Sequence, residues 1–231
     1  MLTQLILPIQ PPDACCFENF YIGQNAILLN SLRHFSRKMG ESYIYIWGNP
    51  GAGCTHLLQA CCHEAQQQGF SVAYLPLNTL KKNNSSEILR GLESVDMVCI
   101  DELESVVGDS IWQESLFHFY NRLQEQTHYL LIAAKNVPNQ LNLSLPDLVS
   151  RLSSGVLFQV RELNDAERLI ALQQRADLRG LELSEEVGQY LLLRLPRDSQ
   201  ALFSALTQLD KASLSLQRKL TIPLVKTILK L

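Results

Sequence analysis

The chain has 231 residues, 46% of them hydrophobic and 19% charged, and a formal net charge of -3 at pH 7. This length suits one α/β domain with a small appendage, since single domains usually hold about 50 to 250 residues, and the composition excludes a disordered or collagen-like protein. The weak acidity excludes the basic field that tight DNA binding needs, and no long apolar run or signal peptide stands out, so we expect a cytoplasmic protein without membrane association.

Residues 1–16 are predicted to form an extended arm. Pro8, Pro11 and Pro12 interrupt this segment, which shows neither helical nor alternating periodicity. The six cysteines of the chain lack the spacing of zinc ligands. Apart from Cys54, they are expected to be small buried side chains in a reducing compartment.

Strand-like and helix-like segments alternate over residues 17–163. The apolar runs that read as strands are residues 43–47, 71–77, 97–101, 129–134 and 156–160. A helix-like segment, residues 55–68, follows the first run, and a shorter one, residues 145–153, precedes the last. This alternation predicts a parallel sheet with helices on both faces.

The pattern changes at residue 164, after which no further strand is indicated. Residues 165–178, 184–195, 199–216 and 223–229 read as helices. Asn164 and Ser184 have the chemistry of helix N-caps, and only Asn164 is followed by the Glu167 of a capping box. We therefore predict a small all-helical lid domain at residues 164–231.

A glycine-rich turn, GNPGAGCT at residues 48–55, follows the first strand. It matches the phosphate-loop pattern G-x-x-x-x-G-K-[ST] except at the lysine, where Cys54 stands. Backbone amides and the following helix N-terminus can bind phosphates without a side chain, but the missing ammonium group costs about 1.5 to 3 kcal/mol, or tenfold to a hundredfold in affinity. The residues predicted to contact a nucleotide here are Gly48, Pro50, Gly51, Ala52, Gly53, Cys54, Thr55 and His56.

The third strand ends in two acids, Asp101 and Glu102, which is the Walker B arrangement. Asp101, with Thr55, would hold Mg²⁺ if it is bound, and Glu102 would orient a water molecule. Either motif alone is weak, because the acids could be solvated loop residues and the glycines a generic turn. Their order along the chain favours a nucleotide-binding P-loop fold.

Five segments carry a resemblance to a known family: FENFYIG (17–23), the altered phosphate loop, CIDELESVVGD (99–109), LNLSLPDLVSRL (141–152) and QRKLTIPLVKTILKL (217–231). Through them the chain resembles the AAA+ region of the DnaA/Hda family of bacterial replication proteins. It is more similar to the Hda branch, without the DNA-binding domain of the initiator. The resemblance extends over residues 17–231.

The resemblance gives the arm a function, because the segment QLILPI (4–9) is similar to the peptides by which replication proteins bind the DNA polymerase III sliding clamp, its beta subunit. A proline-restricted arm loses less entropy on docking. The contacts implied are those of Gln4, Leu5, Leu7, Pro8 and Ile9. From the physics of the segment alone, leucines that fold back onto the domain are the alternative.

Further site residues follow from the same resemblance. Arg151 is implied as an arginine finger presented in trans, and a salt-bridged surface arginine is the alternative. Walls for the nucleotide base are implied at Tyr21 and Ile22, and Gly23 is implied as a further nucleotide contact. The sensor position after the fourth strand falls at Lys135 or Asn136, and the lid position usually held by arginine falls at Gln200, unless Arg197 reaches the site by a shifted register. Because these changes weaken contacts to the outer phosphates, we expect ADP or another nucleoside diphosphate as the ligand.

The resemblance implies a negative regulator of replication initiation that stimulates hydrolysis of ATP held by DnaA, with weak or no ATPase activity of its own and Glu102 latent. A homodimer that masks Arg151 is left open. An autonomous AAA+ ATPase, acting as a loader or remodeller, is the alternative, which the intact Glu102 supports and which Cys54 and Gln200 disfavour. A DNA-binding scaffold is a third hypothesis, and the four cations that motivate it have the spacing of a solvated helix face. They are Arg218, Lys219, Lys226 and Lys230.

Overall fold

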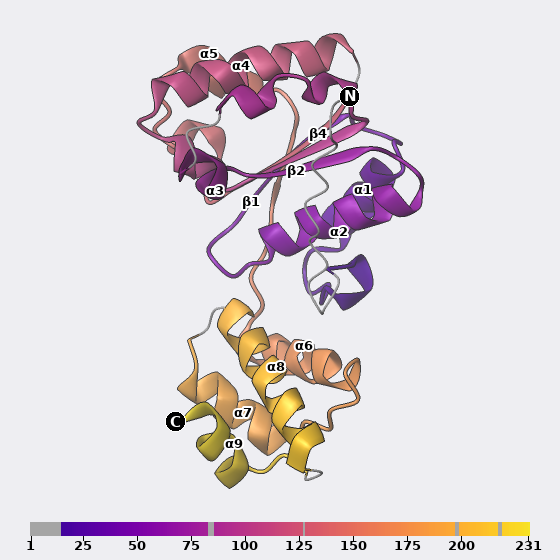
Figure 1. Ribbon diagram of the computed structural model, residues 1–231, viewed down its shortest axis with the longest axis vertical. Coiled ribbons are helices and arrows are strands. Elements are labelled where there is room, and N and C mark those ends of the chain that lie inside the picture. The colour runs from indigo at the N-terminus through magenta and orange to yellow at the C-terminus, as the bar shows by residue number, and fades with distance from the viewer. Residues whose placement is uncertain (1–14, 83–85, 127, 197–198, 217–218) are drawn as a thin grey trace.

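The computed structural model describes residues 15–82, 86–126, 128–196, 199–216 and 219–231. Its centre is a five-stranded parallel sheet with the strand order β2-β3-β4-β1-β5 (Figure 1). The strands are β1 (Tyr43–Trp47), β2 (Val72–Pro76), β3 (Met97–Asp101), β4 (Tyr129–Ala134) and β5 (Val156–Gln159). The predicted parallel sheet is confirmed, and the arm, except for its last two residues, lies outside the described part of the chain.

The strands are apolar because helices cover both faces of the sheet. All five residues of β3 are buried, as are the last five of β4, which is the pattern of a parallel sheet without a solvent-facing side. The second strand is shorter than the predicted 71–77, since α3 (Leu77–Lys82) begins directly after Pro76. A run of apolar residues alone does not mark where a strand gives way to a buried helix.

Two separate cores lie on the two faces of the sheet. One face is covered by α1 (Ala26–Ser36) and α2 (Cys54–Gln67), and the other by α4 (Ser110–Glu125) and α5 (Pro146–Leu152) (Figure 1). Neither α1 nor α4 was assigned from the sequence. Leu32 and Phe35 of α1 are fully buried against the sheet, so packing rather than local signals positions this helix.

The strands all end at the same edge of the sheet, which we call the carboxyl edge. Trp47 of β1 lies in register with Ala134 of β4, and the amide of Gly48 donates a hydrogen bond to the Ala134 carbonyl at 3.2 Å. Asp101 ends β3, the next strand beyond β4. The phosphate loop, the two Walker B acids and the sensor position are therefore brought together, as expected for a ligand site at the carboxyl ends of parallel strands.

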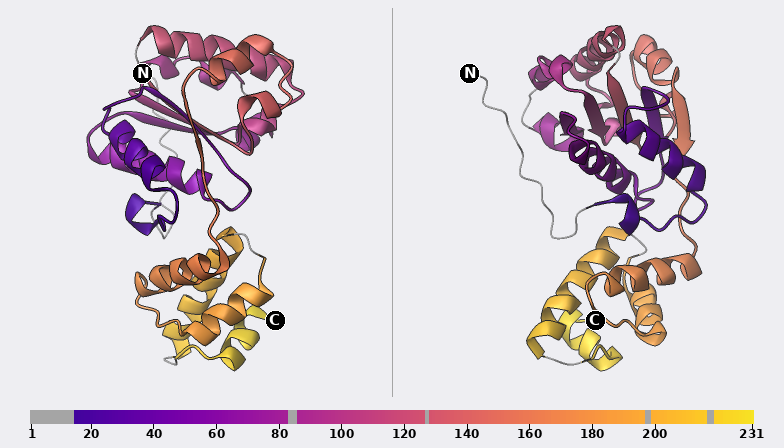
Figure 2. Two further views of the ribbon diagram at one scale, coloured as in Figure 1. Left: turned by 180° about the vertical axis from the view of Figure 1, so that it is seen from behind. Right: turned by 90° about the vertical axis from the view of Figure 1, so that its right-hand side faces the viewer.

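Four helices follow β5 and pack around their own core, apart from the sheet (Figure 2). They are α6 (Asp165–Asp177), α7 (Glu185–Arg194), α8 (Ser199–Leu216) and α9 (Ile222–Leu229). Asn164 and Glu167 form the predicted capping box, with both side chain to backbone distances at 2.9 Å, and Ser184 caps α7 through the Val187 amide. The predicted helical lid is confirmed. In the described residues no helix is long and apolar enough to cross a membrane.

Candidate functional site

The loop between β1 and α2 has the backbone that its glycines predict. Gly51 and Gly53 have φ angles of +86° and +104°, a region that other residues rarely adopt. A Cβ atom on Gly53 would lie 2.7 Å from the Phe20 ring, and one on Gly48 would lie 3.0 Å from the Val160 carbonyl. No side chain caps the first turn of α2. Its amides therefore fit the phosphates of a nucleotide.

Cys54 begins α2 in place of the phosphate-loop lysine. Burial, assisted by the negative charge of Asp101, raises the pKa of its thiol to about 12. The thiol is therefore neutral at pH 7, and it contributes neither the positive charge of a lysine nor the negative charge of a thiolate. The loop can offer phosphates only its amides and the partial charge of the helix N-terminus.

Asp101 lies in reach of three donors at the carboxyl edge. The hydroxyl of Tyr74 donates to one carboxylate oxygen at 2.8 Å, the amide of Glu102 donates to the other at 2.9 Å, and Thr55 also bonds to the carboxylate. Burial raises the pKa of Asp101 against the effect of these bonds. The two residues predicted to hold Mg²⁺, Thr55 and Asp101, are thus in direct contact. Tyr74 was not foreseen, because its position beside Asp101 depends on β2 being next to β3.

Glu102 follows β3 with a φ angle of +57°. Burial and the nearby charges of Asp101 and Glu104 raise the pKa of its carboxyl group, and Lys135 opposes that effect. Two further acids beside Glu102 make this corner of the site strongly negative. A divalent cation would offset that charge when bound.

Lys135 and Glu104 form a pair at the same edge. The Lys135 ammonium lies 3.2 Å from one oxygen of Glu104, and the Lys135 amide donates to the other oxygen, also at 3.2 Å. Tyr45 donates to the Asn136 carbonyl at 2.7 Å and so holds the chain after β4 in place. The predicted sensor position is therefore next to the phosphate loop. Glu104 was missed, since it carries no motif of its own.

The segment predicted to wall the base lies at the start of the described chain. Tyr21 is half-buried, whereas 47% of Ile22 is exposed. Gly23 has a φ angle of +47°, and a Cβ atom there would lie 3.1 Å from Leu163 and 3.5 Å from Glu167. This segment therefore meets the connection between β5 and the lid. That Tyr21 and Ile22 wall the base stays a prediction.

An aromatic pair covers the start of α2. The Phe20 ring lies 5.7 Å from the His56 ring, and His56 Nε2 lies 3.0 Å from the Cys16 carbonyl oxygen. Burial lowers the pKa of His56 to about 4. His56 was a predicted site residue, but Phe20 was not. The resemblance implies roles for Tyr21 to Gly23, the neighbours of Phe20. The contact of Phe20 with Gly53 depends on the folded chain.

Two polar contacts that share Glu162 connect the phosphate loop to the first helix of the lid. Asn49 donates to Glu162 at 2.6 Å, and Glu162 pairs with Arg168 of α6 at 3.1 Å. Asn25, which is 3% exposed, makes two hydrogen bonds with the Arg161 backbone, at 3.0 and 2.8 Å. The loop and the first lid helix are therefore mechanically connected. Arg197 and the side chain of Gln200 lie outside the described part of the chain.

Arg151 lies near the amino ends of the strands, at the end of the sheet opposite to the phosphate loop. It is exposed on α5, and no described residue makes an ion pair or hydrogen bond with its guanidinium group. The next residue, Leu152, is tied to the first residue of β1, because Tyr43 donates to its carbonyl at 2.8 Å. The five residue steps of β1 from Tyr43 to Gly48, about 16 Å at 3.3 Å per residue, therefore separate this region from the phosphate loop. Arg151 does not serve its own phosphate loop.

The cations that suggested a DNA-binding face are dispersed. Lys219 pairs with Glu182 at 2.9 Å, and the Lys226 ammonium lies 5.6 Å from the centre of the Tyr190 ring. Arg218 lies outside the described residues. The pair with Glu182 is typical of a solvated helix face, whereas Arg194 approaches the same Tyr190 ring as Lys226, at 5.8 Å.

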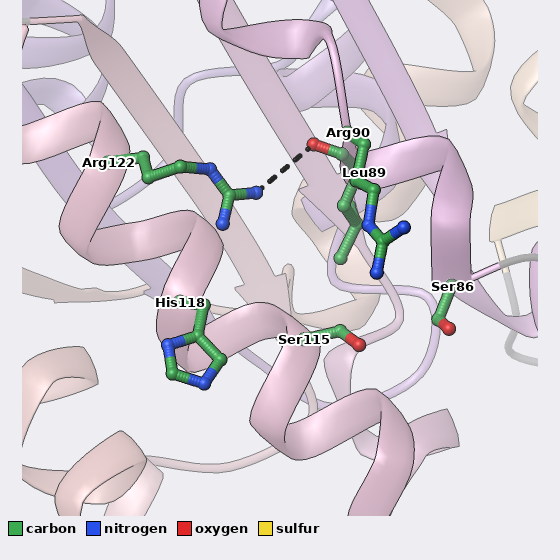
Figure 3. Close-up of a pocket in the computed structure, with 6 residues that line it drawn as sticks. All are labelled: Ser86, Leu89, Arg90, Ser115, His118 and Arg122. Atoms are coloured by element: carbon green, nitrogen blue, oxygen red, sulfur yellow. Dashed lines mark hydrogen bonds between the residues drawn. The ribbon is translucent and has the colours of Figure 1, made fainter.

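A cavity of about 150 Å³ lies away from the phosphate loop on the face of the sheet covered by α4 (Figure 3). It is lined by Ser86, Leu89, Arg90, Ser115, His118 and Arg122. Arg122 points across it toward the Leu89 carbonyl, at 3.5 Å. No residue of the predicted nucleotide site contributes to this cavity, so it is not part of that site.

Taken together, a parallel sheet of this order, a glycine loop before α2, an acid-terminated β3 and a helical lid define a P-loop AAA+ nucleotide-binding fold. The family described as the bacterial DnaA ATPase domain matches residues 13–159, and the family described as the Hda lid domain matches residues 165–229. Because the first match extends over more than half of the chain, the chain belongs to the DnaA/Hda family of AAA+ proteins.

Solved structures share this fold. Domain III of the replication initiator DnaA from Thermotoga maritima superposes with a TM-score of 0.80 and 24% identity, covering 95% of this chain and 97% of that one. AMPPCP-bound DnaA from Aquifex aeolicus gives a TM-score of 0.72 and 28% identity over 89% of this chain and 67% of that chain. The branch-migration motor RuvB of Thermotoga maritima, at 17% identity and a TM-score of 0.64, shares the fold over 91% of this chain and 67% of its own.

Proposed function

We propose that this chain is a clamp-bound, ADP-bound negative regulator of replication initiation, which stimulates hydrolysis of the ATP held by DnaA. Arg151 carries the proposal. It is exposed, has no partner among the described residues and lies at the sheet edge away from its own phosphate loop. A guanidinium group so placed is suited to a nucleotide on another molecule, where an arginine finger raises the rate of hydrolysis by about 10³ to 10⁵.

The chain's own nucleotide site has a supporting role in this proposal. The amides of the phosphate loop hold the diphosphate of ADP, and Thr55 with Asp101 holds Mg²⁺ where it is bound. The neutral thiol of Cys54 leaves the outermost phosphate of ATP without its usual ammonium partner. Bound ADP then stabilises the contact between the loop and the lid, and little ATP is hydrolysed at this site.

The N-terminal arm, residues 1–16, determines where in the cell this activity takes place. The segment Gln4 to Ile9 binds the sliding clamp on DNA, and the regulator thereby meets DnaA after synthesis has begun. This part of the proposal rests on the sequence, because these residues lie outside the described part of the chain. It is separable from the role of Arg151, since the two elements are at different places in the chain.

The decisive experiment measures turnover of DnaA-bound ATP with the clamp loaded on DNA. We expect Arg151→Ala to abolish the stimulation, and Arg90→Ala to retain it. Arg90 is a matched control, because it is also an exposed arginine on the α4-covered side of the sheet. Stimulation by Arg151→Ala equal to that of the unaltered protein would show that the finger is elsewhere.

The arm is tested by co-purification with the clamp. Replacing Gln4 and Leu7 together with alanine removes the polar anchor and one apolar anchor, and we expect binding to the clamp to be lost. Replacing Pro11 and Pro12 with alanine is the control, since both lie beyond the binding segment. Retained binding by the Gln4 and Leu7 variant would favour the alternative in which the leucines pack on the domain.

The intact Glu102 favours a second candidate function, that of an autonomous AAA+ ATPase that loads or remodels a partner. Hydrolysis by the isolated protein separates the two hypotheses. We expect turnover to be very slow and unchanged by Glu102→Gln, because the phosphate loop lacks its lysine. Steady turnover that Glu102→Gln abolishes would favour the ATPase.

A further inference from the structure

The charge around the phosphate loop is unbalanced. Among the described residues that directly follow β1, β3 and β4, the acids are Glu102 and Glu104, and Asp101 ends β3 itself. Lys135 is the cation in this group. A nucleotide brings further negative charge to this edge, so one ammonium group must matter more here than at an ordinary phosphate loop, where the loop supplies its own lysine.

Lys135 stands directly beside the loop. Ala134 pairs in register with Trp47, and its carbonyl accepts a hydrogen bond from the amide of Gly48, the first loop residue, at 3.2 Å. Neighbouring strands are about 4.8 Å apart, and lysine carries its charge on a flexible four-carbon stem. Lys135 therefore follows the strand next to the one that precedes the phosphate loop. Its side chain can extend toward the place where a phosphate-loop lysine would stand, which is occupied here by Cys54.

Glu104 holds this ammonium group at present. The ion pair is 3.2 Å long, and the side chain of Lys135 is 56% exposed, whereas that of Glu104 is 21% exposed. An ion pair with one partner in solvent contributes little to stability. A phosphate oxygen between backbone amides and an ammonium group makes a stronger, charge-assisted contact. Exchange of Glu104 for phosphate would therefore replace a weak contact of Lys135 with a stronger one.

We propose that Lys135 supplies the ammonium group that Cys54 does not, and that the outermost phosphate of a bound nucleoside diphosphate takes Lys135 from Glu104. Glu104 is then a competitor for the ligand, and the strength of its pair with Lys135 tunes nucleotide affinity. This inference rests on the proposed nucleotide site. It is independent of the regulatory role of Arg151.

Calorimetric titration of the whole protein with Mg²⁺-ADP and with AMP tests the inference. We expect Lys135→Met to weaken ADP binding about tenfold, the loss of one charge-assisted contact, and to leave AMP binding unchanged, since AMP has no second phosphate. Lys38→Met is the control. It removes a paired lysine at the amino ends of the strands, where Lys38 lies 2.9 Å from Asp96, the residue before β3, and it should leave ADP binding unchanged.

Two additional variants test the exchange itself. Glu104→Gln releases Lys135 and should strengthen ADP binding severalfold, but should have much less effect when Lys135 is already methionine. Cys54→Lys should restore ADP binding to the Lys135→Met protein, because it returns an ammonium group to the loop. Urea unfolding of each variant shows whether the domain remains folded.

The inference is overturned if Lys135→Met binds ADP as tightly as the parent does, or if it loses ADP and AMP equally. Equal gains from Glu104→Gln with and without Lys135 would also overturn it, since the effect would then be one of net charge. Failure of the parent and of Cys54→Lys to bind ADP at all would instead refute the nucleotide site on which the inference rests.

Discussion

The folded state should lose stability in mild acid because of His56. Burial, assisted by the charge of Arg175, lowers the pKa of this side chain to about 4, against the effect of its hydrogen bond to the Cys16 carbonyl. The neutral ring fits this position, between Phe20 and the first turn of α2. Protonation places a positive charge in a buried position near the guanidinium group of Arg175.

The magnitude follows from the two pKa values. In the unfolded chain the pKa of histidine is about 6.5, so between pH 6.5 and 4 the unfolded state binds more protons than the folded state. Stability therefore rises with pH across this window. The contribution of neutral His56 is fully present above about pH 6.5 and is lost as the pH falls to about 4. A difference of about 2.5 units corresponds to about 3 kcal/mol.

Urea unfolding at intervals from pH 4.5 to 7.5 measures this effect. We expect His56→Asn to start from a lower stability but to vary much less with pH than the parent. His34→Asn, which changes an exposed histidine on α1, should vary as the parent does. The reasoning is refuted if His56→Asn and His34→Asn lose equal free energy of unfolding across the window.

Three further changes have defined outcomes. Lys38 and two hydrogen bonds from Ser71 lower the pKa of Asp96, so Asp96→Asn should cost about 1 kcal/mol at pH 7, reduced by solvent screening because Asp96 is about one-third exposed. Because the folded carboxylate stays charged well below the pKa of about 4 of an unfolded aspartate, that difference should shrink progressively in urea unfolding as the pH falls below about 4; a difference that does not change with pH there would contradict the charge argument. Cys54→Lys should tighten ATP binding tenfold to a hundredfold in fluorescence titration, and an unchanged affinity would mean that the loop does not hold the outer phosphate. Gly53→Ala should lower the free energy of unfolding by about 1 to 3 kcal/mol through its positive φ angle, and an unaltered urea midpoint would contradict it.

The local features of this protein could be predicted from the sequence. Gly51 and Gly53 predict the phosphate loop because positive φ angles favour glycine over other residues. The Asn164 and Glu167 pair predicts the start of the lid, since a capping box spans only four residues. The apolar runs predict buried strands. Each of these signals is contained within a few neighbouring residues, so no knowledge of the fold is needed to interpret it.

The contacts that complete the site were decided by the tertiary structure. Tyr74 donates a hydrogen bond to Asp101 because β2 lies beside β3. Lys135 lies beside the phosphate loop because β4 is placed between β3 and β1. Arg151 is carried to the far edge of the sheet by the connection into β5. Periodicity identifies a strand but not its neighbours. Strand order comes from the joint packing of helices on both faces, and that packing involves residues far apart in the chain.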